Sequence, residues 1–241
     1  MPTSEPSNPF IPGEDQAKLD RVPIQDNGEP LVDFLLLSPR LTLSPSRHRF
    51  DFPRTHLIRQ SVAEMLLAAA ETLPVGWRLS VAEGYRPMNI QRAMYQSALH
   101  EVKTEHPDWN DRQVMTEAGR RSAPPDAPTP PPHTTGGAVD LEIIDQSGQT
   151  LDFSSPFSRT DWRQAAPGSP GLTEEAIANR KLLRNLLEPT GLTNYVDEWW
   201  HWSYGDNGWA LRVGADHALY DRVPTPESID WIGDISKLPG N

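Results

Sequence analysis

The sequence contains no cysteine among its 241 residues. This absence excludes disulfide bonds, a thiolate nucleophile and every metal site built on Cys ligands, including iron–sulfur, blue-copper and Cys-ligated zinc sites. Any metal ion in this protein must therefore be held by histidine and carboxylate side chains, and the chain has 7 His and 33 Asp or Glu.

Basic residues and long apolar runs are also scarce. The chain has 22 Lys or Arg, which gives a net charge of −11, whereas surfaces that bind nucleic acid or anionic membranes need clustered Lys and Arg. No apolar run approaches the roughly 20 residues of a membrane-spanning helix. The first residues, MPTSEPSNPFIPGEDQ, lack the basic and apolar regions of a signal peptide. We therefore expect a cytoplasmic protein that binds neither nucleic acid nor membrane; its oligomeric state is left open.

Proline, by contrast, is abundant and argues against an all-helical fold. There are 25 Pro, about twice the number expected at a usual frequency of roughly 5%, and a Pro inside a helix removes a hydrogen bond and clashes with the preceding turn. The spacing of apolar residues predicts helices at 56–73, 88–103, 111–121 and 173–187, and strands at 31–37, 78–82, 138–144, 195–204 and 209–213. Because strands and helices do not alternate regularly, we expect an α+β fold. It forms a single domain over residues 31–241, preceded by an extended lead-in over residues 1–30.

A first candidate site lies in the segment HTTGGAVD, which places His133 on a loop and Asp140 on the following strand. Gly136 and Gly137 allow a tight backbone turn between the two side chains. An imidazole and a carboxylate joined in this way suit Zn²⁺, which accepts both types of ligand. The alternative, which the spacing alone favours, is an ordinary loop-to-strand junction.

A second candidate lies in the segment DEWWHW, which offers the imidazole of His201 and the carboxylate of Glu198. A catalytic zinc site has three protein ligands and an open position for water, on which a nearby Glu can act as general base. In a regular strand, residues i and i+3 point to opposite faces, so these two side chains share a site only if the strand is bulged or twisted. The alternative is a Trp-rich core strand with an exposed His.

A third candidate, Arg86, lies in the segment EGYRP at the end of a predicted strand. Its guanidinium suits either a substrate carboxylate or the oxyanion of a tetrahedral intermediate, and the alternative is an Arg–Glu pair on the surface. The sequence contains no GxSxG, phosphate-binding loop, GxGxxG or HExxH motif.

Together, EGYRP, PHTTGGAVDLEI and NYVDEWWHWSYGD resemble the D-alanyl-D-alanine dipeptidases, the VanX-like branch of the M15 zinc peptidases. The resemblance runs from about residue 45 to residue 213. It implies a mixed sheet flanked by helices, as in D,D-peptidases and the hedgehog signalling domain, and hydrolysis of free D-Ala-D-Ala in a confined pocket. It also implies one zinc ion per chain, with the site residues His133, Asp140 and His201 as ligands, Glu198 as general base and Arg86 as the stabiliser of the anionic intermediate.

The same resemblance makes two structural predictions. The strand that carries His201 should break its regular pairing around Trp199 and Trp200. The proline-rich stretch SAPPDAPTPPP, residues 122–132, runs directly into His133. We therefore expect this stretch to form a stiff wall or lid beside the active site rather than a linker between domains.

Some positions depart from the family pattern. Several relatives have a Ser two residues before the first His, where this chain has Pro131. Many also have an acidic residue after the central strand that can meet the substrate ammonium, and here Asp152 and Asp161 are the candidates. These departures keep two alternatives open, a D,D-carboxypeptidase and a relative that acts on another modified peptide. A non-catalytic zinc-binding interaction module is a third, but such a module needs neither Glu198 nor Arg86.

Overall fold

The computed structural model describes residues 13–45, 54–158 and 161–224. Within them, the main sheet has five strands in the order β2-β4-β5-β7-β6. The strands are β2 (Leu41–Leu43), β4 (Arg78–Glu83), β5 (Ala138–Ile144), β6 (Thr193–Asn194) and β7 (His201–Ser203). Strand β2 runs parallel to β4 and the other neighbours are antiparallel. The sheet is therefore mixed, and the α+β prediction is confirmed.

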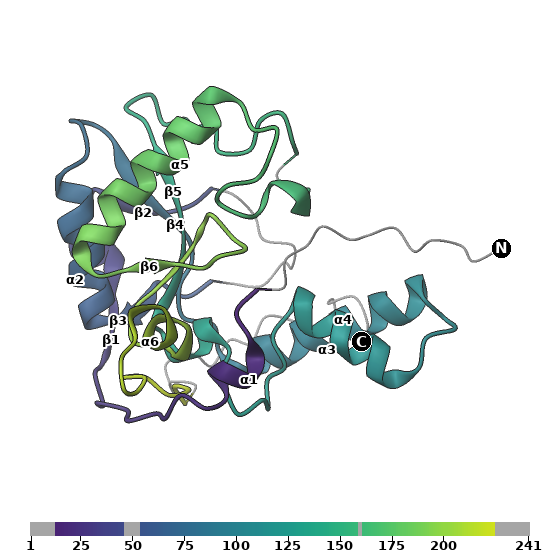
Figure 1. Ribbon diagram of the computed structural model, residues 1–241. Helices are drawn as coiled ribbons and strands as arrows, with labels where there is room; N and C mark the ends of the chain where they lie inside the picture. The colour runs from purple at the N-terminus through teal and green to yellow at the C-terminus, as the bar shows by residue number, and fades with distance from the viewer. Residues whose placement is uncertain (1–12, 46–53, 159–160, 225–241) are drawn as a thin grey trace.

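One face of this sheet is covered by two helices, α2 (Gln60–Glu71) and α5 (Glu174–Leu187), which lie on the same side in Figure 1. Alternate residues of β5, Leu141 and Ile143, pack in one apolar cluster with Leu66 of α2 and Leu183 of α5. All four are 0% exposed, and burying each contributes about 1.5–3 kcal/mol. Because successive side chains of a strand point to opposite faces, the apolar residues of β5 face the helices and Asp140 points to the other face of the sheet.

The other elements of the described chain complete the fold. These are α1 (Gln16–Leu19), α3 (Met88–Glu105), α4 (Asp111–Arg121), α6 (Asn207–Val213), the 3-10 turns η1 (Phe34–Leu36), η2 (Pro132–Thr135), η3 (Trp162–Gln164) and η4 (Glu188–Thr190), and a pair of antiparallel strands, β1 (Leu31–Asp33) and β3 (Leu57–Arg59). Helices α3 and α4 form a hairpin that extends away from the sheet (Figure 1) and has a small apolar cluster of its own. The N-terminal helix α1 packs against α6.

Most of the predicted elements are present. Helices are confirmed at 88–103, 111–121 and 173–187, and strands at 78–82 and 138–144. The region 56–73 is a helix only from Gln60, because its first residues pair with β1 as strand β3. The region 31–37 leaves the strand at Asp33, whose side chain accepts a hydrogen bond from the Leu35 N–H at 2.9 Å and starts η1.

Two strand predictions are wrong. Residues 209–213 lie in the helix α6, because Asp206 caps it by accepting a hydrogen bond from the Trp209 N–H at 2.6 Å and Gly214 ends it with a φ of 70°. Of the region 195–204, only His201–Ser203 is strand, and the residues before it form a turn. The expected lead-in contains helix α1, which Asp15 caps.

Candidate metal centre and active site

The first candidate ligand, His133, lies in the 3-10 turn η2, which ends at Gly136 with a φ of 72°. Its Nδ1 lies 3.0 Å from the carbonyl oxygen of Gly84, so Nδ1 carries the proton and donates it. Gly84 also packs closely against Leu57: a Cβ added to Gly84 would come within 2.9 Å of the Leu57 carbonyl oxygen, so this position needs glycine. The Nε2 atom of His133 is left as a lone-pair donor and faces Asp140 at 3.4 Å. A carbonyl that fixes the tautomer is a usual partner of metal-ligating histidines.

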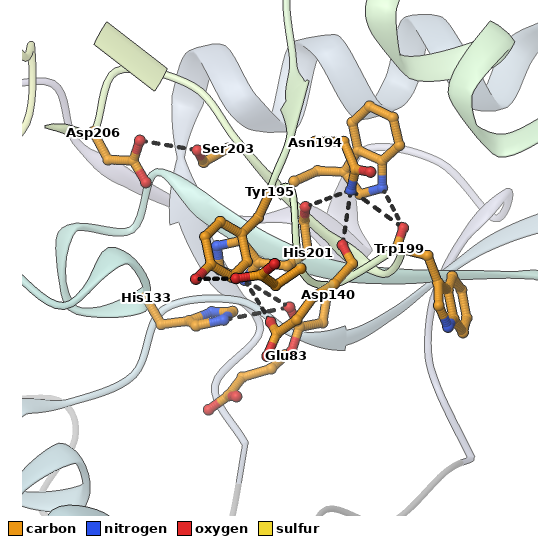
Figure 2. A network of polar contacts seen from close by, with 12 residues as sticks. Glu83, His133, Asp140, Asn194, Tyr195, Trp199, His201, Ser203 and Asp206 are labelled. Carbon is orange, nitrogen blue, oxygen red and sulfur yellow. Dashed lines mark hydrogen bonds and ion pairs between the residues drawn. The ribbon is translucent and has the colours of Figure 1, made fainter. Parts of the chain in front are cut away.

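The other two candidate ligands lie on neighbouring strands. Asp140 of β5 and His201 of β7 are opposite each other in the ladder, and Asp140 Oδ1 is 3.0 Å from His201 Nδ1. The ligand atoms of His133, Asp140 and His201 all lie within 4.8 Å of one another (Figure 2). Two imidazoles and one carboxylate at this spacing match the His and carboxylate ligand set of Zn²⁺.

The electrostatics of this centre favour a positive charge. Burial by itself raises the pKa of Asp140, but the two neighbouring imidazoles outweigh burial and hold the pKa well below its usual value. Burial by itself lowers the pKa of His133, but the charges of Asp140 and Glu83 and the hydrogen bond to Asp140 together raise that pKa above its ordinary value. The ionised carboxylate therefore stabilises a cation between these side chains, as a zinc centre requires.

Glu198 reaches the centre from a turn and not from a strand. Residues 195–200 connect β6 to β7, and the Tyr195 N–H closes this turn by donating to the His201 carbonyl at 2.9 Å. Strand β7 begins only at His201, so the predicted break around Trp199 and Trp200 is confirmed. The turn brings the Glu198 carboxylate to 3.9 Å from His201 Nδ1. Partial burial of the Glu198 side chain in the cavity raises its pKa to about 7.

Arg86 is largely buried and is not part of a surface pair. Its Nε donates to Glu83 Oε1 at 2.6 Å, its Nη2 donates to Glu83 Oε2, and its Nη1 donates to Gln91 Oε1 at 2.6 Å. The side chains of Arg86 and Glu83 are 11% and 4% exposed. Burial by itself lowers the pKa of Arg86, but Glu83 more than offsets this and raises the pKa above its ordinary value. The backbone N–H of Arg86 donates to the His133 carbonyl at 3.0 Å, which places the guanidinium beside the metal centre.

A single cavity of about 350 Å³ is lined by the five site residues predicted from the sequence: Arg86, His133, Asp140, Glu198 and His201. The proline-rich stretch 122–132 also lines this cavity, notably with Pro124, Pro130 and Pro131. Its predicted place as a wall beside the site is confirmed.

The two candidates for the substrate ammonium lie elsewhere. Asp152 lines a different cavity, and its Oδ1 accepts hydrogen bonds from the Ser154 and Ser155 N–H groups at 2.9 and 3.0 Å. Asp161 is paired with Arg163 at 2.5 Å. Neither aspartate lines the cavity of the metal centre, so the structure does not bring the two to the site.

The polar residues of the cavity that sequence reasoning missed include Glu14, Gln91, Asp206, Asn207 and Arg212. Glu14 and Arg212 form an ion pair across 198 positions of the chain. No local pattern marks such residues, because only the folded chain brings them together.

The mixed sheet and the buried His–His–Asp centre, with a carboxylate and a guanidinium in the same cavity, define this protein as a zinc-dependent hydrolase. The comparison with known families makes the assignment more specific. The family profile of peptidase M15, described as D-Ala-D-Ala dipeptidase, matches residues 47–221, and the chain belongs to this family.

Individual relatives cover most of the chain at low identity. The chain is 27% identical over 231 residues to a D-alanyl-D-alanine dipeptidase of Synechocystis sp., a match that covers 84% of this chain and 92% of that protein. It is 28% identical over 151 residues to the D-alanyl-D-alanine dipeptidase of Enterococcus faecium, covering 60% of this chain and 71% of that protein.

Two solved structures are also similar to this chain. One is a variant of the vancomycin-resistance D,D-pentapeptidase VanY in complex with Zn(II), with 17% identity, coverage of 70% of this chain and 86% of that chain, and a TM-score of 0.38. The other is VanYB in complex with D-alanine-D-alanine, with 17% identity, coverage of 70% and 84%, and a TM-score of 0.39. Separately, none of the helices in the described ranges has the length and apolar character needed to span a bilayer.

Proposed function

We propose that this protein hydrolyses the peptide bond of free D-Ala-D-Ala, with Glu198 as the general base. The observation that carries the proposal is the convergence of a three-ligand centre, one carboxylate and one guanidinium in a single small cavity. The choice of substrate is supported by the family match over residues 47–221 and by relatives named for this dipeptide.

Glu198 has the environment of a proton carrier. His133, Asp140 and His201 would hold a zinc ion, which would act as a Lewis acid and lower the pKa of a water molecule. Glu198 accepts the proton of the attacking water and passes it to the nitrogen of the leaving amine. With its pKa raised by burial to about 7, this carboxyl group can take up and release a proton near neutral pH. A cation in the centre lowers that pKa and so favours the carboxylate form that the first step needs.

Arg86 supplies donors to the oxygen that becomes negative when water adds to the carbonyl carbon. A guanidinium has five N–H groups, and the bonds to Glu83 and Gln91 use three of them, which leaves two for the oxyanion. The same bonds hold the guanidinium in one orientation. A preoriented donor in a site with little water stabilises such an oxygen by about 2.7–4 kcal/mol.

The size of the cavity favours a small substrate. At about 350 Å³ the cavity lies near the lower end of the range of ligand pockets, about 300–1,000 Å³. The proline-rich wall restricts one side, because proline fixes its own φ and cannot easily be displaced by a longer chain. A free dipeptide fits this space better than a peptidoglycan stem peptide.

The experiment that tests the proposal is a substrate panel with zinc-loaded protein, read out as released D-alanine. We expect cleavage of D-Ala-D-Ala and no cleavage of L-Ala-L-Ala or of a pentapeptide that ends in D-Ala-D-Ala. Equal cleavage of the pentapeptide would instead identify a D,D-carboxypeptidase. Failure to cleave any D,D-peptide at measurable rates would reject the substrate assignment.

A further inference from the structure

A free dipeptide carries a protonated amino group at neutral pH, because an α-amino group has a pKa of about 7.7–8.0. An enzyme that selects free dipeptides therefore gains from a negative group opposite that ammonium. Three carboxylates of the cavity have a part in the proposed reaction: Asp140 in the metal centre, Glu83 as the partner of Arg86, and Glu198 as the proposed base. Two further carboxylates line the cavity: Glu14, which pairs with Arg212, and Asp206, which caps α6.

Glu14 belongs to an N-terminal arm, residues 13–24, that packs against the cavity. At its start, Gly13 lies so close to the Tyr195 hydroxyl that an added Cβ would be 2.4 Å from it. Further along, Asp20 accepts a hydrogen bond from the Thr129 hydroxyl of the proline-rich wall at 2.6 Å, and Ile24 forms a β-bridge with Ala218. The arm is therefore held on both sides of the cavity.

Glu14 and Asp206 flank one guanidinium, that of Arg212. Glu14 forms an ion pair with Arg212 Nη1, and Asp206 Oδ1 lies 3.9 Å from Arg212 Nη2. The Glu14 and Asp206 side chains are 10% and 3% exposed. When both are ionised, two carboxylates around one guanidinium carry a net charge of −1. Burial raises the pKa of Glu14 above its ordinary value, and a cation placed opposite Glu14 favours its ionised form. Glu14 and His201 line the same cavity, so this wall and the metal centre border one space.

An independent observation at the same wall is a buried acceptor with no partner. Asn207 lines the cavity and is 2% exposed. Its Nδ2 donates to the carbonyl oxygens of Leu19 and Val22 at 3.3 Å, whereas its Oδ1 accepts no hydrogen bond within the described structure. Buried oxygens without a donor are rare in folded proteins, and an ammonium group brings three donors.

We propose that Glu14, supported by Asp206 and Asn207, is the specificity-determining residue that receives the ammonium group of the substrate. The inference rests on the proposed dipeptidase function and names the part of that site which the sequence left open. It also gives the N-terminal arm a function, since the arm supplies the side chain that separates a free dipeptide from a chain with a blocked or extended amino end.

The test compares D-Ala-D-Ala with N-acetyl-D-Ala-D-Ala, which lacks the positive charge, in the zinc-loaded full chain and in the Glu14→Gln variant. We expect the substitution to lower kcat/KM for D-Ala-D-Ala by about 10- to 100-fold, the range of one hydrogen bond to a charged group. The value for the acetylated substrate should change by less than about twofold, because that substrate offers no charge to lose. A folding defect lowers both values alike, so the ratio of the two reports the ammonium contact.

The matched control is Asp15→Asn, on the neighbouring residue of the arm. Asp15 is exposed, does not line the cavity and caps α1 by accepting the Ala17 N–H, and Asn keeps a cap while removing the same charge. We expect this variant to behave like the unchanged chain. If the acetylated substrate is cleaved too slowly to measure, calorimetry replaces kinetics. The affinity for D-Ala-D-Ala is then measured in a Glu198→Gln background with and without Glu14→Gln, and we expect the Glu14→Gln substitution to weaken it by the same 10- to 100-fold.

The outcomes separate this inference from the proposed function. Unchanged chain that cleaves no D,D-dipeptide contradicts the function itself. Unchanged chain that cleaves D-Ala-D-Ala, together with a Glu14→Gln variant that keeps the full preference over the acetylated substrate, contradicts only the role of Glu14.

Discussion

At the residue scale, His201 and Glu198 lie three positions apart in the chain but occupy different environments. The His201 side chain is 9% exposed and in contact with Asp140 inside the metal centre. The Glu198 side chain is 39% exposed, lines the cavity and lies 3.9 Å from His201 Nδ1. In our proposal the histidine holds the metal ion and the glutamate faces the substrate, so mutation of each residue tests a different role.

The first prediction concerns Glu198→Gln, which keeps the shape of the side chain and removes the base. We expect kcat to fall by about 10²- to 10⁴-fold, the usual contribution of a positioned acid–base group, while the protein still binds one zinc ion per chain. Initial rates and metal analysis of the same preparation measure both quantities. The control is Glu188→Gln, on a glutamate of η4 that is 57% exposed. Turnover that survives in Glu198→Gln would mean that another group is the base.

At the scale of elements, the turn between β6 and β7 carries Glu198, the proposed base. The side chain of Asn194, at the end of β6, donates from Nδ2 to the carbonyl oxygens of Glu198, Trp199 and His201 at 2.9, 3.3 and 2.8 Å (Figure 2). One amide thereby ties together three residues of a turn that regular strand pairing does not hold. The position of the Glu198 carboxylate depends on this amide, although Asn194 does not line the cavity.

The second prediction follows for Asn194→Ala. Losing these bonds removes one donor from each of three carbonyl oxygens, which keep their other donors, and should cost about 0.5–1.5 kcal/mol of folding free energy per lost hydrogen bond. It should also lower kcat, because Glu198 is no longer held in place. The matched control is Asn179→Ala, which removes a bond from Nδ2 to the Asp152 carbonyl at 2.8 Å away from the cavity. We expect chemical denaturation to show a lower free energy of unfolding for both variants. We expect kinetics to show a lower kcat only for Asn194→Ala. Equal kcat values in the two variants would contradict the positioning role.

At the scale of the whole molecule, the metal centre joins distant parts of the chain. His133 comes from a turn after the proline-rich wall, Asp140 from the middle of the sheet and His201 from a strand 61 positions later. These ligand atoms lie within 4.8 Å of one another only in the folded chain. A metal ion that binds them must therefore stabilise the folded state relative to the unfolded one.

The third prediction is that zinc raises the melting temperature and a chelator lowers it. A free zinc concentration of 100 times Kd adds about 2.7 kcal/mol, and each kcal/mol shifts Tm by about 2–4 °C for a chain of this size. Differential scanning fluorimetry with and without zinc measures the shift. The His133→Ala variant should lose the zinc-dependent shift in Tm. The control variant His217→Ala should keep this shift, because His217 is not part of the centre. A full zinc-dependent shift in His133→Ala would place the metal elsewhere.

The sequence predicted the central elements from short-range patterns, and it predicted the centre from the resemblance of three motifs to a known family. Alternation in β5 and helical spacing in α3 and α5 identify these elements, since one face of each is buried in the core or against a neighbouring element. The prediction of a strand at 209–213 was wrong because two residues just outside this apolar run favour a helix. Asp206 caps the N-terminus of the helix, and Gly214 ends it. Such end effects are decided by single hydrogen bonds and not by periodicity.

By itself, then, the sequence determined that any metal in this protein must be held by His and carboxylate side chains, because it contains no cysteine. The resemblance to a known family named the candidate ligands and, together with the geometry of a strand, predicted the break before His201. Only the tertiary structure decided that Glu14 and Asp206 line the same cavity and that Asp152 and Asp161 do not. The reason is physical: the contact between Glu14 and Arg212 spans 198 positions, and the packing of the arm against α6 brings them together, which no spacing within a motif records.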